Sequence, residues 1–425
     1  FFTNTTIGAC SQVISDENDN AKKSRFYDEL INQNIIRNNK KWTSERIEAE
    51  KRSLIQTEDH GDTPRIMHFD NMGRVFLEEN SLDAGQRLYT YSKLDVSGNK
   101  ISITDPRQYE KNKDRPPKDH VRNFIHFYDM QNRQLATNSA DSGFVMVLPN
   151  SMNNAMYLWT ARNAVINTQY DKMQRVVQVH VAGGDLQLDN LVEEIKYGES
   201  SPLVEQKKYN LLGRPILHKD QAGIREYLSY NIKGQNLKSS FRLRQEYKKE
   251  VDWNTEHGQE LLEVDENGLS LLYESESLFD AEGKLRLKKQ SDGSILKYSN
   301  HMSGLLKSVA VMIPSESELF EDYVIEIKYN PKGQRVLIQY GNGTITTYNY
   351  EKETFRLESV KTQRSSDNLN KKFLQDLSYV YDPVGNITQI EDKSHKTVFH
   401  NQSKIDPLSR NTYDSLYRLT ESSGR

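Results

Sequence analysis

The chain has 425 residues, of which 28% are charged and 35% hydrophobic, and its formal net charge at pH 7 is -3. Because both signs of charge are interspersed, this balance argues against nucleic acid or an anionic membrane surface as a partner. The 23 tyrosines and 14 phenylalanines suit thin sheets with amphipathic aromatic faces better than one thick aliphatic core.

Cys10 is the only cysteine, so the sequence contains no disulfide framework and no thiol-rich metal cluster. No run approaches the roughly 18 apolar residues that a membrane helix needs, and we expect no direct membrane insertion. The chain starts without Met and stops directly after a strand-like pattern. We therefore expect both ends to continue in a longer polypeptide.

Residues 1–60 are predicted to form a helical or irregular lead-in segment. Charge is dense and β-branched runs are few from about residue 16 to residue 56. Thr43 or Ser44 can cap a helix. Two stripes of side chains mark the expected helices, the first formed by Phe26, Leu30 and Ile31 and the second by Ile47, Lys51 and Leu54.

From residue 61 to residue 425 one short motif recurs. An aromatic or apolar residue is followed by Asp or Asn, two variable residues, Gly and a polar residue. The Asp or Asn and the Gly of its full copies are Asp70 and Gly73, Asp95 and Gly98, Asn210 and Gly213, Asn231 and Gly234, Asp280 and Gly283, Asn330 and Gly333, and Asp382 and Gly385. Copies without the glycine follow Tyr128, Tyr170 and Tyr413. Spacing of roughly 20 to 50 residues is typical of repeat arrays with variable loops.

Each copy of the motif predicts a strand, a turn and a returning strand. The Asp or Asn can accept hydrogen bonds from nearby backbone N–H groups, and Pro331 and Pro383 supply the φ of a type I turn. The glycine can adopt the left-handed conformation that closes a bulged hairpin. Further turns at residues 292–293 and 341–343 mark the opposite hairpin ends, so we expect a continuous antiparallel meander of structural repeat turns.

Three places depart from this pattern. Asn132 occupies the glycine position of its copy and tolerates the left-handed conformation, whereas Gln174 and Tyr417 would lose roughly 1 to 2 kcal/mol there. We therefore expect a different turn geometry at Gln174 and Tyr417. Residues 109–120 are densely charged and contain Pro116-Pro117, which predicts an exposed loop. The sequence pattern does not determine the strand register of residues 144–177.

The ordered series of repeats resembles the Rhs or YD-repeat proteins, and in particular the carboxyl-terminal part of the B component of insecticidal toxin complexes. The resemblance spans about Trp42 to Arg425. It is carried by the tracts at residues 62–70, 329–343, 377–392 and 413–419.

The resemblance implies a mainly β fold in which hairpins continue into a spiralling sheet, part of a hollow cocoon shell, with residues 61–425 as the shell region. It implies a structural, non-catalytic role in encapsulating an unfolded toxic effector for delivery. The implied partners are a C-type component or a fused C-terminal Rhs half with its cargo, and a pore-forming A component that is contacted through a propeller outside this chain. A secreted or extracellular location is expected. The alternative is a teneurin-like carbohydrate-binding or cell-adhesion module.

The residue pattern predicts no catalytic residue, no cofactor and no metal site. The ten histidines show no zinc-ligand spacing, and Gly341-Asn342-Gly343 is expected to be a hairpin turn because no helix pattern follows it. Many Asp residues occupy turn positions, which leaves no acid and base pair for a hydrolase. Sugar stacking on Trp42, Trp159 and Trp253 competes with ordinary sheet packing of these aromatic residues.

Overall fold

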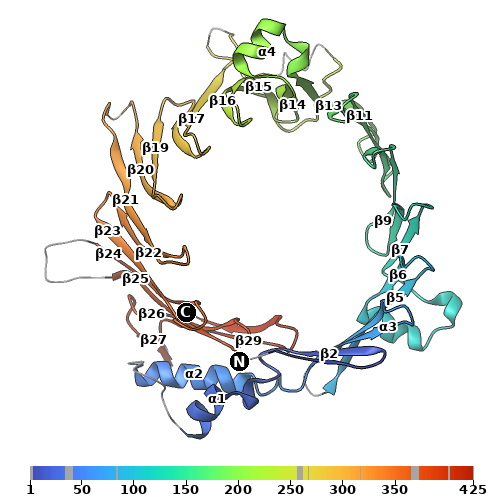
Figure 1. Ribbon diagram of the computed structural model, residues 1–425, viewed down its shortest axis with the longest axis vertical. Coiled ribbons are helices and arrows are strands. Elements are labelled where there is room, and N and C mark those ends of the chain that lie inside the picture. The colour runs from blue at the N-terminus through green and yellow to red at the C-terminus, as the bar shows by residue number, and fades with distance from the viewer. Residues whose placement is uncertain are drawn as a thin grey trace. The chain divides into compact units, whose positions relative to one another are not determined.

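A computed structural model describes residues 3–33, 42–82, 85–255, 262–266, 268–315, 317–364, 373–400 and 403–424 (Figure 1). The chain divides into two compact units, which are described separately here. Unit 1 consists of Phe1–Phe124 and Glu326–Arg425, and unit 2 consists of Ile125–Ile325.

The amino-terminal strands of unit 1 form an antiparallel meander in which each strand pairs with the next one along the chain. They are β1 (Asn4–Ile7), β2 (Ser11–Ser15), β3 (Arg65–Phe69), β4 (Val75–Ser81), β5 (Arg87–Leu94) and β6 (Lys100–Thr104). Strands β1 and β2 lie within the predicted lead-in segment, where no strand was expected. The boundary between residues 60 and 61 stays a prediction.

A helical segment separates β2 from β3. It contains η1 (Ala21–Lys23), α1 (Arg25–Tyr27), the π-helical turn η2 (Asp28–Asn32) and α2 (Ser44–Gln56). The side chain of Thr43 caps α2 by accepting a hydrogen bond from the Arg46 N–H. Tyr27, Leu30 and Leu54 form a buried cluster against which Phe26, Ile31 and Ile47 pack, so both predicted stripes meet.

The carboxyl-terminal strands of unit 1 continue the same antiparallel pattern, except that β26 pairs with β29 across an excursion. They are β22 (Arg335–Tyr340), β23 (Thr344–Tyr350), β24 (Leu357–Arg364), β25 (Phe373–Tyr381), β26 (Ile387–Asp392), β29 (Leu408–Tyr413) and β30 (Leu419–Ser423). The excursion holds a separate hairpin of β27 (Val398–His400) and β28 (Ser403–Ile405). Helix α2 packs against β25 and β26 (Figure 1).

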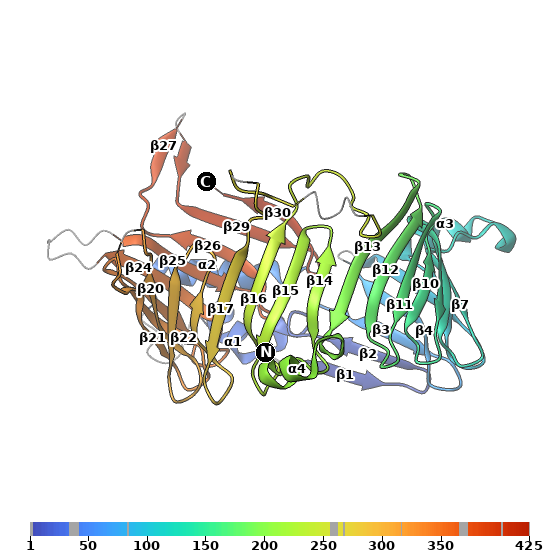
Figure 2. The ribbon, with the colours of Figure 1, turned by 90° about the horizontal axis from the view of Figure 1, so that it is seen from above.

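Unit 2 is a second antiparallel meander, whose strands form a single layer in Figure 2. Its first and last residues lie in β7 (Phe124–Tyr128) and β21 (Glu321–Tyr329). Between them are β8 (Gln134–Ser139), β9 (Gly143–Pro149), β10 (Ala155–Trp159), β11 (Ala164–Tyr170), β12 (Val176–Gly183), β13 (Leu188–Tyr197), β14 (Pro215–Asp220), β15 (Gly223–Tyr230), β16 (Asn236–Leu243), β17 (Tyr273–Phe279), β18 (Leu285–Lys289), β19 (Ile295–Asn300) and β20 (Leu306–Met312). The prediction of a mainly β protein built from antiparallel hairpins, with a short helical amino-terminal segment, is confirmed.

Apolar packing in unit 2 is concentrated where the chain between β16 and β17 folds back over neighbouring strands. Val251, Trp253 and Leu262 from this excursion pack with Leu191 and Ile224 of the sheet. The Trp253 indole N–H donates to the Asp220 carbonyl at 3.2 Å, so the excursion is also held by a polar contact.

Most of residues 109–120 are exposed, as predicted, but the prediction that the whole segment is a loop is wrong. Helix α3 (Pro106–Lys113) and the 3-10 turn η4 (Pro117–Asp119) occupy this segment. Asp105 caps α3 by accepting from the Gln108 N–H at 2.8 Å, and Pro106 stands in the first turn, where its missing N–H costs nothing. The Asn112 side chain then exchanges two hydrogen bonds with the Val121 backbone and fixes the returning chain.

The expectation for Gln174 and Tyr417 is also wrong, because both adopt the left-handed conformation, with φ of 64° and 61°. Their turns close as the glycine turns do, with each N–H donating to the carbonyl of the motif Asp three residues earlier. Side-chain contacts offset the strain: Gln174 accepts a hydrogen bond from the Asn150 side chain, and Tyr417 donates one to Asp16.

Replacing Gly73 by alanine tests the conformational requirement alone, because a Cβ at this position would meet nothing within 4 Å. With φ at +74°, we expect Gly73→Ala to lower the free energy of opening of the β3–β4 hairpin by about 1–2 kcal/mol. Hydrogen exchange of the Asp70 amide, which donates to the Arg74 carbonyl, should accelerate accordingly.

Gly73→Asn is the matched control, because asparagine already adopts this conformation at Asn132 and Asn163. Its amide exchange should lie closer to that of the native chain. Equal exchange rates in the alanine and native proteins would contradict the requirement for a left-handed residue.

Candidate functional site

The repeat turns are the most regular polar feature of the described chain. In all seven full copies the glycine has positive φ, between 74° and 122°. In the copy at Asp70, Oδ1 accepts from the N–H groups of Met72 and Arg74, and Oδ2 accepts from Arg74 Nε at 2.7 Å. One carboxylate therefore satisfies several backbone donors and orients the side chain four residues later.

The same pairing of the motif Asp or Asn with the side chain four residues later recurs in both units. In unit 1 it joins Asp95 with Asn99, Asn330 with Gln334, Asp382 with Asn386, and Asp414 with Arg418. In unit 2 it joins Asp129 with Arg133, Asp171 with Arg175, and Asn231 with Gln235. Asp280 accepts from the Glu282 and Lys284 N–H groups only, because the Lys284 ammonium pairs with Glu282 instead.

The copy at Asn210 has a different structure from the predicted one. Helix α4 (Leu203–Tyr209) precedes it, so Tyr209 ends a helix rather than a strand, and Asn210 is the left-handed residue that ends this helix, with φ of 54°. Pro202 at the helix start and the helix-forming residues after it favour this outcome. Gly213 keeps its positive φ, and its N–H donates to Glu199.

Three of the motif carboxylates are held ionised by their hydrogen bonds. The Arg74 side chain lowers the pKa of Asp70, and the Asn99 side chain lowers the pKa of Asp95. The Lys284 backbone N–H lowers the pKa of Asp280. The turns thus prefer a charged carboxylate or, at Asn231 and Asn330, a neutral amide that offers the same acceptor.

A tyrosine at the end of the first strand ties five of the hairpins to the preceding one. Its hydroxyl donates to a backbone carbonyl of that hairpin at 2.6 to 3.0 Å. Four of the pairs involve a motif tyrosine, namely Tyr170 with Ala155, Tyr230 with Pro215, Tyr381 with Leu357, and Tyr413 with Ile387; the fifth joins Tyr350, which precedes a turn without the motif, with Arg335. Burial raises the pKa of Tyr230 and of Tyr381, which keeps these hydroxyls protonated as donors. The tyrosine therefore does more than cover the sheet with its ring.

A second link runs from one turn forward to the next. Arg74 Nη1 donates to the carbonyls of Asp95 and Val96 at 3.1 and 3.0 Å. Gln235 Nε2 donates to the Gly283 carbonyl at 2.7 Å, although 48 residues separate them. Arg356 donates to the carbonyls of Asp382 and Pro383 at 2.7 and 2.6 Å. Within each unit the turns are therefore joined into a row, which we call the turn row.

In unit 1 the amino-terminal segment contacts the last turns of this row. We call residues 16–63 the clamp segment. Asn18 is 1% exposed; its amide donates to Asp382 Oδ2 at 3.1 Å and accepts from the Val384 N–H at 3.2 Å. Tyr417 donates to Asp16, and His60 Nε2 lies 3.0 Å from the Tyr413 carbonyl. Chain segments more than 350 residues apart are thus bound through buried polar groups.

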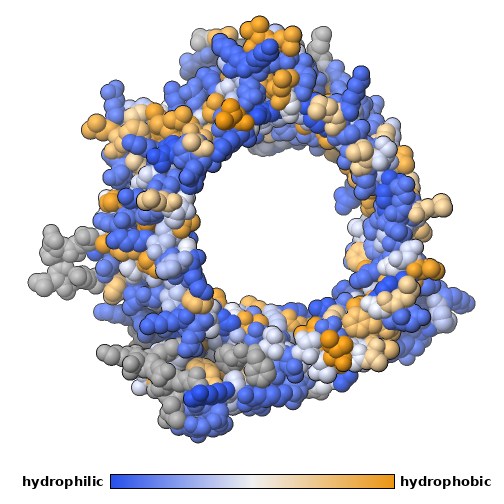
Figure 3. Space-filling model, in the orientation of Figure 1, coloured by the Kyte–Doolittle hydropathy of each residue, from blue (hydrophilic) through white to orange (hydrophobic). Residues whose placement is uncertain are grey.

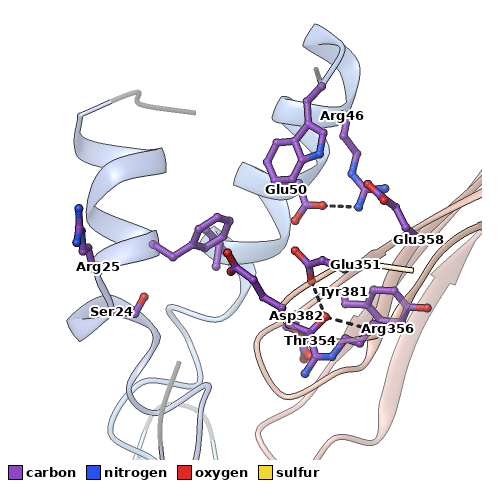
Figure 4. Close-up of a pocket in the computed structure, with 14 residues that line it drawn as sticks. Ser24, Arg25, Arg46, Glu50, Glu351, Thr354, Arg356, Glu358, Tyr381 and Asp382 are labelled. Carbon is purple, nitrogen blue, oxygen red and sulfur yellow. Dashed lines mark hydrogen bonds and ion pairs between the residues drawn. The ribbon is translucent and has the colours of Figure 1, made fainter. Parts of the chain in front are cut away.

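A pocket of about 420 Å³ lies between the clamp segment and the carboxyl-terminal strands of unit 1 (Figure 4). Arg46 on α2 pairs with Glu50 at 2.6 Å, and Arg356 is held by the backbone carbonyls named above. Glu351 and Glu358 lie on the same side of the pocket as Arg356, opposite α2 (Figure 4). The arginines already have partners, and the arrangement is that of a polar joint between two chain segments.

Among the residues that the structure describes, no group of three or more His, Cys, Asp or Glu side chains is arranged to hold a metal ion. In the same residues, no helix has the length and apolar character needed to cross a membrane. His395 is paired with Asp392 at 3.8 Å, and the side chain of His400 lies outside the described residues.

The residues of the turn row could be found in the sequence, but the clamp residues could not. The Asp-x-x-Gly spacing marks the turns, and the tyrosine before it signals the backward hydrogen bond. Asn18 belongs to the polar stretch Asp16-Glu17-Asn18-Asp19-Asn20, which has no feature that indicates burial against Asp382.

Comparisons with known proteins identify relatives among toxin subunits, although no protein-family model matches the chain. Toxin subunit YenC1 of Yersinia entomophaga is 27% identical over 378 residues, which cover 86% of this chain. Toxin subunit YenC2 of the same organism is 26% identical over 390 residues, which cover 85%. The chain spans 38% of the length of each relative.

Solved toxin-complex structures contain the same fold. The crystal structure of TcdB2-TccC3 is matched with a TM-score of 0.82 and 26% identity, over 99% of this chain and 18% of that one. The Tc holotoxin pore of Photorhabdus luminescens is matched with the same TM-score and identity, over 100% of this chain and 18% of that one. The predicted resemblance to Rhs-repeat toxin-complex components is confirmed.

We expect acid to destabilise the turn row. The pKa values of Asp70, Asp95 and Asp280 are lowered in the folded chain, so their contribution to stability is fully present above the unfolded pKa of about 3.9. It is lost as the pH falls through the lower folded pKa. Thermal unfolding between pH 2 and pH 7 should show a falling midpoint below about pH 4.

Asn can replace the motif Asp where the side chain four residues later is not arginine, as Asn231 and Asn330 show. The double variant Asp95→Asn and Asp280→Asn should therefore match the native protein at pH 7 and lose less stability in acid. A variant that loses as much stability in acid as the native chain would show that these carboxylates do not carry the effect.

Asn18→Ala tests the clamp segment. The change leaves the buried Val384 N–H without its acceptor and Asp382 without one donor, which should cost about 1–3 kcal/mol. We expect faster hydrogen exchange at Val384 and faster proteolysis between residues 379 and 417. Asn32→Ala, which removes an exposed bond to Asp28 in the same segment, is the control and should change neither. Equal behaviour of the two variants would contradict a clamping role.

Proposed function

We propose that this chain, which is homologous to the toxin subunits YenC1 and YenC2 and has the fold of TcdB2-TccC3, is a wall segment of a shell. The shell would enclose an unfolded toxic effector until delivery. The similarity supports a toxin-complex component, and enclosure of the effector is the step that we add. We propose no catalytic role for the chain.

The turn row is the observation that carries this proposal. A single two-stranded hairpin is only marginally stable in water, so an array of hairpins needs each neighbour beside it. Here the neighbours are joined by strand pairing and by side-chain hydrogen bonds to turn carbonyls, such as those of Arg74 and Arg356. Such an array suits an extended wall that depends little on a thick apolar core.

The proposed partners follow from the relatives. We propose that the chain assembles with a C-type component, or with a fused C-terminal Rhs half, that carries the toxic cargo. A pore-forming A component would be contacted through a propeller outside this chain. The repeat motifs of this chain resemble those of the B component, whereas the relatives found by sequence comparison are the subunits YenC1 and YenC2. We propose an extracellular site of action, with neither nucleic acid nor direct membrane insertion involved.

The test uses the full-length protein, expressed with an effector-bearing partner subunit and exposed to protease. We expect the effector to resist digestion while the assembly is intact. Arg356→Ala removes two hydrogen bonds between neighbouring turns, worth about 2 kcal/mol together. The open population, and with it effector digestion, should rise roughly 30-fold.

Arg364→Ala, at an exposed position on β24, is the matched control and should leave protection unchanged. An effector that is digested in the native assembly as fast as when free would overturn the proposal. Binding to a glycan array that is lost on mutating exposed tyrosines would instead favour the teneurin-like adhesion module.

A further inference from the structure

One stretch of unit 2 differs from the rest of the chain in charge. Strands β7 to β12 contain no Asp, Glu, Lys or Arg, although the whole chain is 28% charged. Other strands place charges at their exposed positions, as β21 does with the sequence EDYVIEIKY. Between residues 125 and 175, the charged side chains lie in the turns and not in the strands.

Several exposed apolar side chains of this stretch lie on one face of the sheet. Phe144, Met146 and Leu148 alternate along β9 and so point to the same face. Met146 pairs with Trp159 of β10, and Leu148 pairs with Tyr157. Tyr157 and Trp159 stack at 5.6 Å, and Phe127 contacts Phe144 edge-on at 6.3 Å. We call Phe127, Phe144, Met146, Leu148, Tyr157 and Trp159 the apolar panel.

Four of the six panel residues are exposed in the described chain, and Tyr157 and Trp159 are half-buried. Phe127 is 50% exposed, Phe144 45%, Met146 37% and Leu148 48%. Figure 3 shows hydrophilic side chains over most of the visible surface, with apolar patches between them. We expect a charge-free face of aromatic and methionine side chains on such a surface to be covered by an apolar partner.

The size of the panel limits what can cover it. At roughly 200 Å² for each large side chain, these four exposures amount to roughly 350 Å². A stable protein–protein interface needs about 800 Å² on each partner. A second copy of this chain, or a folded subunit seated on the panel alone, would therefore not bind stably. A flexible segment could bind, provided that it is confined nearby and so held at high effective concentration.

We infer that the apolar panel is a transient docking surface for weakly charged, apolar segments of an unfolded polypeptide. This inference rests on the proposed function, which supplies the confined chain. Methionine and aromatic side chains adapt to many apolar sequences, which suits a surface that meets an unfolded chain without a fixed register. The small area keeps each contact weak, so the polypeptide can leave.

Site-specific crosslinking in the full assembly tests this inference. The photoreactive residue p-benzoylphenylalanine replaces Phe144 in one variant and Val145 in the other. Val145 is the next residue on β9, so its side chain lies on the opposite face of the same strand. We expect crosslinks to the effector from position 144 and none from position 145. Adding Met146→Lys to the first variant should remove most of the crosslinked product.

The outcomes separate this inference from the proposed function. A protease-protected effector with no crosslink from position 144, or with crosslinks only from position 145, overturns the docking surface and leaves the enclosing wall standing. Crosslinks from position 144 to another subunit or to a second copy also overturn it. An effector that is not protected at all overturns the proposed function, and the docking surface with it.

Discussion

The fold depends on how the carbonyl groups at its hairpin turns are satisfied. A tight turn leaves backbone carbonyls that its own strands cannot pair, and each such group that is shielded from water costs free energy unless it finds a donor. In this chain the donors come from adjacent hairpins: guanidinium and amide groups reach forward, and tyrosine hydroxyls reach back. In the described residues, the two clusters of buried apolar side chains contain five and three residues, so the polar links between hairpins contribute much of the packing.

The clamp segment uses the same chemistry from a different source. Asn18 donates to Asp382 and accepts from Val384, and His60 lies against the Tyr413 carbonyl. At these turns the clamp segment supplies hydrogen-bond partners. Elsewhere in unit 1 such partners come from neighbouring hairpins. The helices of this segment contribute the apolar cluster around Leu30 and Leu54, which packs them against one another.

Local rules predicted the hairpins, and tertiary contacts explain the departures. The Asp-x-x-Gly spacing was enough to place the turn at Asp70, because its hydrogen bonds lie within five residues. Tyr417 adopts a left-handed conformation that local sterics disfavour, and its partner Asp16 stands at the other end of the chain. Helix α3 was missed because charge density outweighed the capping signal of Asp105 and Pro106. The sequence around Asn18 does not predict its contact with Asp382, and the sequence of the apolar panel does not predict what binds there.

The bond between Gln235 and Gly283 has a consequence for how such chains can diverge. It joins two successive motif turns that are 48 positions apart in the sequence, and the excursion that fills this interval packs over β13 and β15, near the opposite hairpin ends. Selection on the motif edge therefore leaves the other edge open to insertion. New loops can accumulate there over evolutionary time, and an engineer could graft a reporter or a recognition peptide at that edge while the register of the array is kept.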